Sequence, residues 1–182
     1  DDFRFGRKRS GDLQVMKQLG EKWGFTVSSA NTYEVNGTRV SSSRIRQALQ
    51  NSEFDLASEL LGYRYSINGK VAHGDKRGRT IGFPTANISL RHDNIPVWGV
   101  YAVYVHSINR EAWPGVANIG VRPTVDGKKI LLETHLLDFN ENLYGERIKV
   151  EFLTKIRSEK KFSSFDLLKN QILLDSEEAR NW

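Results

Sequence analysis

Two oxygen-bearing side chains, Thr85 and Asn87, stand two residues apart in a segment that reads GFPTAN. Successive side chains of an extended chain point to opposite sides, so this hydroxyl and this amide should lie together. Pro84 restricts the backbone and favours an extended residue before it. Hydroxyl and amide oxygens suit Mg²⁺ when the ion also keeps water and substrate phosphates. The pair predicts a metal and phosphate site; the competing interpretation is an ordinary strand end.

The segment before this pair alternates glycines, spaced four residues apart, with basic side chains. A flexible loop that exposes backbone N–H groups and carries positive charge can cover a polyphosphate. Glycine- and arginine-rich segments also form solvated hairpin loops, so both interpretations stay open. The candidate nucleotide ligands in this loop are Gly74, Lys76, Gly78, Arg79 and Gly82.

From residue 63 onward, the segments that must position these residues have a sequence pattern typical of β-strands. Short segments rich in Val, Ile, Tyr and Leu alternate with Gly, Asn, Asp and Pro turns, and none has a helical period. This pattern is typical of an antiparallel sandwich or small barrel. The expected strands cover residues 64–72, 84–90, 98–108, 112–119, 130–139 and 147–156.

Two local signals refine this β region and its end. Residues 126–127 read DG, which predicts a hairpin turn before the strand that starts at Ile130. Residues 163–166 read SSFD, which predicts the cap of a final helix. That helix should carry one apolar face, made by Phe165, Leu168, Ile172 and Leu173.

The first third predicts helices and one short strand. Apolar residues recur at helical spacing over residues 12–23, and Gly24 ends the pattern. Residues 26–35 read as a strand with polar edges. Residues 52–55, SEFD, predict a capping box that opens a helix over residues 54–61.

Three serines at positions 41–43 precede a helical run that contains Arg46. Serines at this place are helix N-caps in the simplest interpretation. Alternatively, their hydroxyls and the helix-start amides hold phosphate oxygens, which makes Ser42, Ser43 and Arg46 candidate ligands.

Composition limits the class of protein. The chain has 182 residues, 38% of them hydrophobic and 27% charged, and no cysteine, which excludes disulfides, thiolate zinc sites and a cysteine nucleophile. No apolar run has the length of a membrane span, so no membrane partner and a cytoplasmic location are expected. The net charge of +5 suits either a nucleic-acid binder or an enzyme that handles anionic nucleotides.

The segment GRTIGFPTAN at residues 78–87 resembles the signature of the riboflavin kinases. Further segments resemble that family in the same order: GVYA at 99–102, ANIGVRPT at 117–124, ETHLLDF at 133–139, LYG at 143–145 and IRSE at 156–159. The resemblance implies a mainly β fold, a six-stranded antiparallel Greek-key barrel with a C-terminal helix. It also implies ATP and riboflavin as substrates, FMN as product and Mg²⁺ as cofactor.

The same resemblance implies roles for individual residues. Glu133 stands where the family has its catalytic base, and Thr85 and Asn87 would hold Mg²⁺ and phosphates. Glu133 and His135 should share one face of a strand, where a carboxylate could accept a hydroxyl proton. A solvent-facing ion pair is the alternative for such a residue.

Other candidates are weaker. Arg122 and Asn118 could contact phosphate or flavin, or lie in solvent. Gly99 and Tyr101 could approach the nucleotide, or belong to a buried strand. Among the aromatic residues, Phe139, Tyr144, Phe152 and Phe162 could flank a flavin ring, although barrel aromatics usually belong to the core.

Residues 41–46, SSSRIR, together with the opening DDFRFG, resemble the end of the FMN adenylyltransferase domain of bacterial bifunctional FAD synthetases. Residues 1–62 are therefore expected to be a small α/β remnant of that domain, and residues 63–182 the riboflavin kinase domain. The chain opens as if cut from something longer. It lacks the His-x-x-His motif that adenylate transfer requires in that family, so this activity is expected only in a longer protein.

A second functional class accounts for the basic charge: a β-barrel that binds single-stranded nucleic acid through Arg77, Arg79 and exposed aromatic residues. It does not explain the Thr85 and Asn87 pair or the ordered segments. Small-molecule substrates are therefore the expected partners, and nucleic acid is not.

Overall fold

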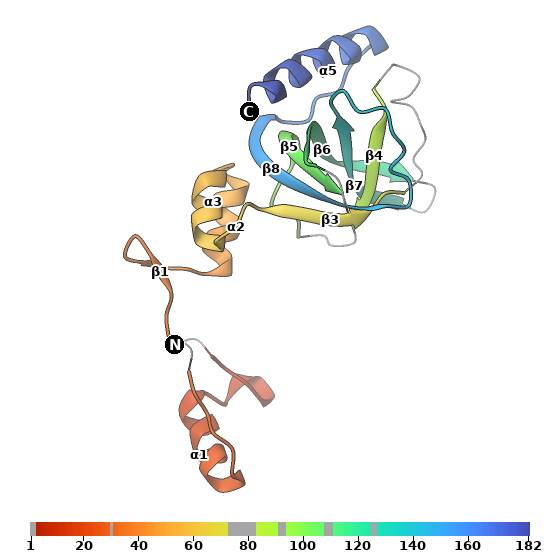
Figure 1. Cartoon of the computed structure of the whole chain (residues 1–182). Coiled ribbons are helices and arrows are strands. Elements are labelled where there is room, and N and C mark those ends of the chain that lie inside the picture. Colours follow the sequence, from red (N-terminus) through yellow and green to blue (C-terminus); the bar gives the residue numbers. More distant parts are fainter. Residues whose placement is uncertain (1–2, 30, 73–82, 91–93, 108–110, 125–126) are drawn as a thin grey trace. The chain divides into compact units, whose positions relative to one another are not determined.

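The computed structural model describes residues 3–29, 31–72, 83–90, 94–107, 111–124 and 127–182. Its contacts divide the chain into two compact units, Asp1–Val40 and Ser41–Trp182, which are described separately (Figure 1). None of the described helices combines the length and apolar character that crossing a bilayer requires.

The first unit contains a short 3-10 turn, η1 (Arg7–Arg9), helix α1 (Leu13–Trp23) and a small hairpin. The side chain of Asp12 accepts a hydrogen bond from the Val15 amide at 3.0 Å, and Gly24 ends α1 with φ of 74°, as the sequence predicts. The strand expected over residues 26–35 is wrong for most of its length. Of the described residues in that range only Glu34 and Val35 are in a strand, β1 (Glu34–Val35), which pairs with β2 (Thr38–Arg39) through a turn at Asn36 and Gly37, both with positive φ.

The second unit starts with two short helices, α2 (Ser42–Gln50) and α3 (Phe54–Leu61). The hydroxyl of Ser41 accepts a hydrogen bond from the Arg44 amide at 3.2 Å, so this serine is the N-cap of α2. The expected capping box at residues 52–55 is wrong. Ser52 instead completes the end of α2, with positive φ and its amide bonded to the Leu49 carbonyl, and α3 starts without a side-chain cap.

Six antiparallel strands form the barrel, and sequence analysis predicted this architecture correctly. They are β3 (Ser66–Lys70), β4 (Thr85–Leu90), β5 (Gly99–Ser107), β6 (Trp113–Thr124), β7 (Gly127–Leu136) and β8 (Arg147–Arg157), hydrogen-bonded in the order β3-β8-β5-β6-β7-β4. The neighbours β8-β5-β6-β7 have Greek-key order. The Ala72 amide bonds to the Asn87 carbonyl at 2.8 Å, which brings the end of β3 to β4 and nearly closes the barrel.

The barrel interior takes every second residue of each strand. In β7 these are Leu132, Thr134 and Leu136, all buried, whereas Glu133 and His135 face outward as the period-2 pattern predicts. Helices α2 and α3 contribute to the same core: the ring of Phe54 stacks on Phe152 with centroids 6.3 Å apart.

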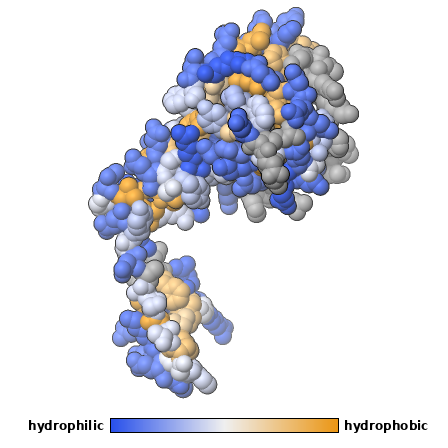
Figure 2. All heavy atoms as spheres, viewed as in Figure 1, coloured by the Kyte–Doolittle hydropathy of each residue, from blue (hydrophilic) through white to orange (hydrophobic). Residues whose placement is uncertain are grey.

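Helix α5 (Phe165–Arg180) contacts β5, β6 and β8 on the outside of the barrel. Ser164 caps it, accepting a hydrogen bond from the Leu167 amide at 3.3 Å. The predicted apolar face is partly wrong, because Phe165 and Leu173 are exposed while Leu168 and Ile172 are half-buried. The inward face instead continues through Asp175, Ser176 and Ala179. Figure 2 shows the exposed hydrophobic residues along α5 in orange.

Candidate active site

Polar side chains from three neighbouring strands meet on the outer face of the barrel. Asn87 on β4 lies directly opposite Glu133 on β7, which in turn lies opposite Asn118 on β6. Thr85 is paired in the same way with His135. Because directly opposite residues of adjacent strands have side chains on the same face, these five groups form one continuous polar surface.

The side chains of Thr85 and Asn87 lie together, as their spacing predicts. The amide nitrogen of Asn87 donates to the Thr85 carbonyl at 3.3 Å and lies 3.5 Å from the Thr85 hydroxyl. That orientation leaves the amide oxygen of Asn87 as an acceptor. The structure therefore brings the side chains of Thr85 and Asn87 together on the face of the sheet that also carries Glu133.

Glu133 is held by an arginine from the neighbouring strand. Arg122 donates from Nε at 3.0 Å and from Nη2, both to Oε2 of Glu133. Its third nitrogen, Nη1, donates at 3.0 Å to Oε1 of Glu159, which also accepts from Nδ2 of Asn118 at 3.2 Å. Burial lowers the pKa of the Arg122 guanidinium, but the charge of Glu133 and the hydrogen bonds to both carboxylates outweigh it and raise that pKa.

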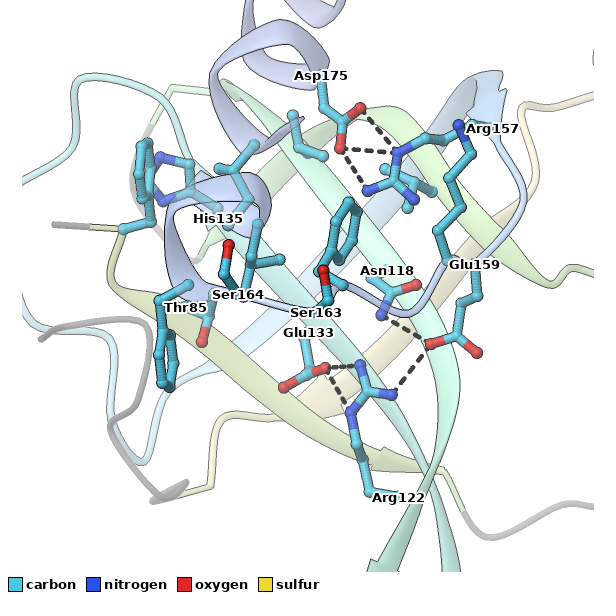
Figure 3. A pocket seen from close by; sticks show the side chains of 18 residues that line it. Thr85, Asn118, Arg122, Glu133, His135, Arg157, Glu159, Ser163, Ser164 and Asp175 are labelled. Carbon is cyan, nitrogen blue, oxygen red and sulfur yellow. Dashed lines mark hydrogen bonds and ion pairs between the residues drawn. The ribbon is translucent and has the colours of Figure 1, made fainter. Parts of the chain in front are cut away.

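A cavity of about 540 Å³ opens beside this cluster, between the outer face of the barrel, residues 158–164 and α5. Figure 3 shows Glu133, Arg122, Asn118 and Glu159 on one side of it. Thr85 and His135 line it as well, and α5 and the preceding segment add Phe162, Phe165, Leu168 and Ile172. The site therefore combines one carboxylate-rich wall with one apolar wall.

A buried ion pair fixes α5 over the cavity. Arg157 at the end of β8 donates from Nη2 to Asp175 at 2.7 Å and from Nε to both of its oxygens at 2.9 and 3.1 Å. The Asp175 side chain is only 3% exposed, and it also accepts from Gln171 at 2.9 Å. This pair explains why an acidic residue lies on the inward face of α5.

His135 links β7 to the residues before β4. Its Nδ1 lies 2.9 Å from the Pro84 carbonyl oxygen, so Nδ1 is the donor. Its ring also meets Phe83 edge to face, with centroids 5.2 Å apart. The histidine thus anchors the two residues directly before Thr85 and so helps to position Thr85.

The remaining candidates are distributed differently. Gly74, Lys76, Gly78, Arg79 and Gly82 lie outside the described residues. Tyr101 is 1% exposed in the barrel interior, where burial raises the pKa of its hydroxyl to about 12. Gly99 has φ of 116° and packs against the Arg157 carbonyl, where a side chain would overlap it.

Two other groups of candidates, with the exception of Phe162, do not line the cavity. Ser42, Ser43 and Arg46 are exposed on α2. Of the four aromatic candidates, Phe162 lines the cavity, while Phe139, Tyr144 and Phe152 belong to the core or pack against it. Among the described residues no group of three or more His, Cys, Asp or Glu side chains could hold a metal ion.

Sequence reasoning missed the roles of Glu159, Arg157 and Asp175. Arg157 and Glu159 fall in the segment IRSE, but nothing local shows that they reach α5 and Arg122. A weak signal exists at Gly120: a strand glycine often marks close approach of another group, and here that group is the Glu159 carboxylate.

Comparison with known proteins supports the resemblance. A family model described as riboflavin kinase matches residues 61–182, and one described as FAD synthetase matches residues 1–44. Residues 45–60 belong to neither match and the second compact unit starts at Ser41, so the domain boundary at residues 62–63 stays a prediction.

Similar proteins cover the whole chain. The bifunctional riboflavin kinase/FMN adenylyltransferase of Escherichia coli (strain K12) is 50% identical over 182 residues, all of this chain and 58% of that protein. The Haemophilus influenzae protein of that name is 49% identical over 180 residues, again 58% of its length. A Streptococcus pneumoniae crystal structure described as a macrolide-efflux protein has a TM-score of 0.76 at 36% identity, covering 100% of this chain and 58% of its own.

The chain thus spans 58% of the length of these relatives. The riboflavin kinase model nevertheless covers the barrel, the cavity and α5 completely, and the ordered segments found in the sequence lie within it. This chain belongs to the riboflavin kinase family.

Proposed function

We propose that the chain transfers the γ-phosphate of ATP to the 5′-hydroxyl of riboflavin and so produces FMN. The observation that carries this proposal is the position of Glu133. Its carboxylate lines a cavity beside Thr85 and Asn87, and its Oε1 has no hydrogen bond with a described residue. A base with one oxygen that bonds to none of the described residues, next to a polar edge, suits transfer of phosphate to a bound hydroxyl.

In this mechanism Oε1 of Glu133 accepts the proton of the ribityl hydroxyl. The hydroxyl oxygen forms its bond to the γ-phosphorus as the bond to the β-phosphate bridging oxygen breaks, and ADP leaves with that electron pair. Arg122 keeps the carboxylate oriented through Oε2. Positioning of this kind supplies much of the rate in phosphoryl transfer, because the protein contributes little covalent chemistry.

Thr85 and Asn87 are the residues that would hold Mg²⁺. Their donor set fits a hard cation: Thr85 offers a hydroxyl oxygen, and Asn87, which is paired with Glu133 across the sheet, offers an amide oxygen that stays an acceptor while its nitrogen faces Thr85. Bound Mg²⁺ would neutralise phosphate charge. The loop of residues 74–82 directly precedes this edge in the chain, and we propose that its glycines and basic residues cover the nucleotide.

The cavity suits a flavin. Its volume lies within the usual range of small-molecule sites. Val100, Val116, Phe162, Leu168 and Ile172 offer apolar surface for a planar ring, while Glu133 lies where a polar side chain of that ligand would end. Because ATP is the proposed donor, the cytoplasm is the proposed location.

Adenylate transfer to FMN is proposed only for a longer protein of this family. The FAD synthetase match covers residues 1–44, and Ser42, Ser43 and Arg46 lie at the start of α2 with exposed side chains. In such a protein these residues would contact the nucleotide phosphates of the second reaction.

The test is chromatographic. The chain is incubated with riboflavin, ATP and Mg²⁺, and riboflavin, FMN and FAD are separated. FMN without FAD, lost on chelation of the metal and in Asn87→Ala, is the expected result. FAD formation would contradict the assignment of the second activity to a longer protein. Absence of FMN from chain shown to be folded by circular dichroism would contradict the proposed function itself.

A further inference from the structure

Arg122 lies between two carboxylates of the same cavity and divides its donors unequally between them. Nε and Nη2 both bond to one oxygen of Glu133, while Nη1 bonds to Glu159. The second oxygen of Glu133 points away from the guanidinium (Figure 3). The arginine therefore holds Glu133 without covering the oxygen that the proposed reaction uses.

This arrangement is not the one that an isolated pair prefers. Arginine and a carboxylate commonly form two parallel hydrogen bonds, one to each oxygen. That geometry would engage both oxygens of Glu133 and leave none free for a substrate proton. In the structure Nε and Nη2 instead share one oxygen of Glu133, and the remaining nitrogen, Nη1, is bound by Glu159.

We propose that Glu159 is a positioning residue that acts on Glu133 through Arg122, an inference that rests on the proposed kinase function. By binding Nη1, Glu159 fixes the rotation of the guanidinium and keeps Oε1 of Glu133 open to the substrate hydroxyl. Glu159 itself transfers no proton.

The surroundings of Glu159 are built for this contact. Its Oε1 accepts two hydrogen bonds, from Arg122 at 3.0 Å and from Asn118 at 3.2 Å. The space for this carboxylate exists because residue 120 is a glycine, since a Cβ there would overlap the Glu159 carboxylate. Every second residue of β6 from Asn118 to Arg122, with Gly120 between them, lies on one face of the strand. The same strand therefore supplies both hydrogen-bond donors to Glu159 and the space for its carboxylate.

The test compares three variants in steady-state FMN formation. Glu159→Ala removes the acceptor, and Gly120→Ala displaces it without changing any polar group. Glu159→Gln keeps an oxygen acceptor for both donors. We expect kcat to fall about tenfold in the first two, with the riboflavin KM changed by less than about threefold, and the glutamine variant to stay within about threefold of wild type.

Glu177→Gln is the matched control. It removes one carboxylate charge from an exposed position on α5 and should leave both constants unchanged. Thermal unfolding of each variant verifies that it is folded. A normal kcat in both Glu159→Ala and Gly120→Ala would overturn the inference, and so would a loss confined to KM, which would make Glu159 a substrate contact.

A readout that needs no turnover separates this inference from the proposed function. The side-chain Nε–H NMR resonance of Arg122, assigned by its loss in Arg122→Lys, should move in Glu159→Ala and Gly120→Ala but not in Glu177→Gln. An unmoved resonance contradicts the inference even if wild-type chain makes FMN. Absence of FMN from wild-type chain contradicts the proposed function, whatever the resonance does.

Discussion

Replacing Asp175 by asparagine should destabilise the barrel strongly, although the change is nearly isosteric. Arg157 and Asp175 form the most buried ion pair of the described residues, with side chains 14% and 3% exposed. Asparagine would place an N–H₂ group against a guanidinium that has only donors. The arginine would keep its charge without a counter-charge.

The magnitude follows from burial. Breaking a buried pair by removing one partner costs about 3 to 5 kcal/mol, because the remaining charge is desolvated and uncompensated. In a chain of this length that loss lowers Tm by about 6 to 20 °C. With its oxygen in the Oδ1 position, asparagine keeps the acceptor for Gln171 but turns its N–H₂ group to Nη2 of Arg157; in the opposite orientation it also turns this group to Gln171.

Asp138→Asn provides a stringent comparison. Asp138 contacts Arg180 at 2.6 Å, closer than any contact of Asp175, but its side chain is 74% exposed. Asparagine also tolerates the positive φ of residue 138. Exposed pairs contribute little, so Asp138→Asn should leave the Tm measured by circular dichroism nearly unchanged. Equal Tm losses in the two variants would refute the argument that burial, rather than contact distance, decides the contribution.

Two further predictions concern the barrel interior. The pKa of Tyr101 rises from 10.0 to about 12 in the folded chain, mainly through burial. A raised folded pKa stabilises the fold below pH 10, and this contribution is lost between pH 10 and 12. Wild type should therefore lose more stability than Tyr101→Phe in urea unfolding over that range, and parallel curves would contradict this. Thr134 is buried and its hydroxyl has no hydrogen bond with a described residue. Thr134→Val should therefore not lower the urea midpoint. A decrease of more than about 1 kcal/mol in the free energy of unfolding would show that the hydroxyl has a hydrogen-bond partner.

Local patterns predicted the elements that depend on local physics. The six strands were found because hydrophobic segments alternate with turn residues, and α1 because apolar residues recur at helical spacing as far as Gly24. The placement of Glu133 and His135 on one face followed from the period of a strand alone. These signals need no knowledge of what lies opposite.

What failed depends on contacts between distant residues. The face of α5 was misjudged because Asp175 is buried only when Arg157 arrives from β8, eighteen positions earlier. Likewise the pairing of Arg122 with Glu133 and Glu159 depends on the register of β6 and β7 and on the segment after β8. The register between strands cannot be derived from a local sequence pattern. Glu159 was therefore missed, although Asn118 and Arg122, which bond to it, were candidate site residues.

Glu133 is the residue that we propose as the base for phosphorylation of riboflavin. The most direct measurement is the rate of FMN formation by Glu133→Gln relative to wild type, with riboflavin binding measured in parallel by quenching of flavin fluorescence. Glutamine keeps the size and one oxygen of the side chain but cannot take the proton. We expect kcat to fall about 100-fold or more while riboflavin binding is retained. Wild-type turnover in the folded variant would contradict it.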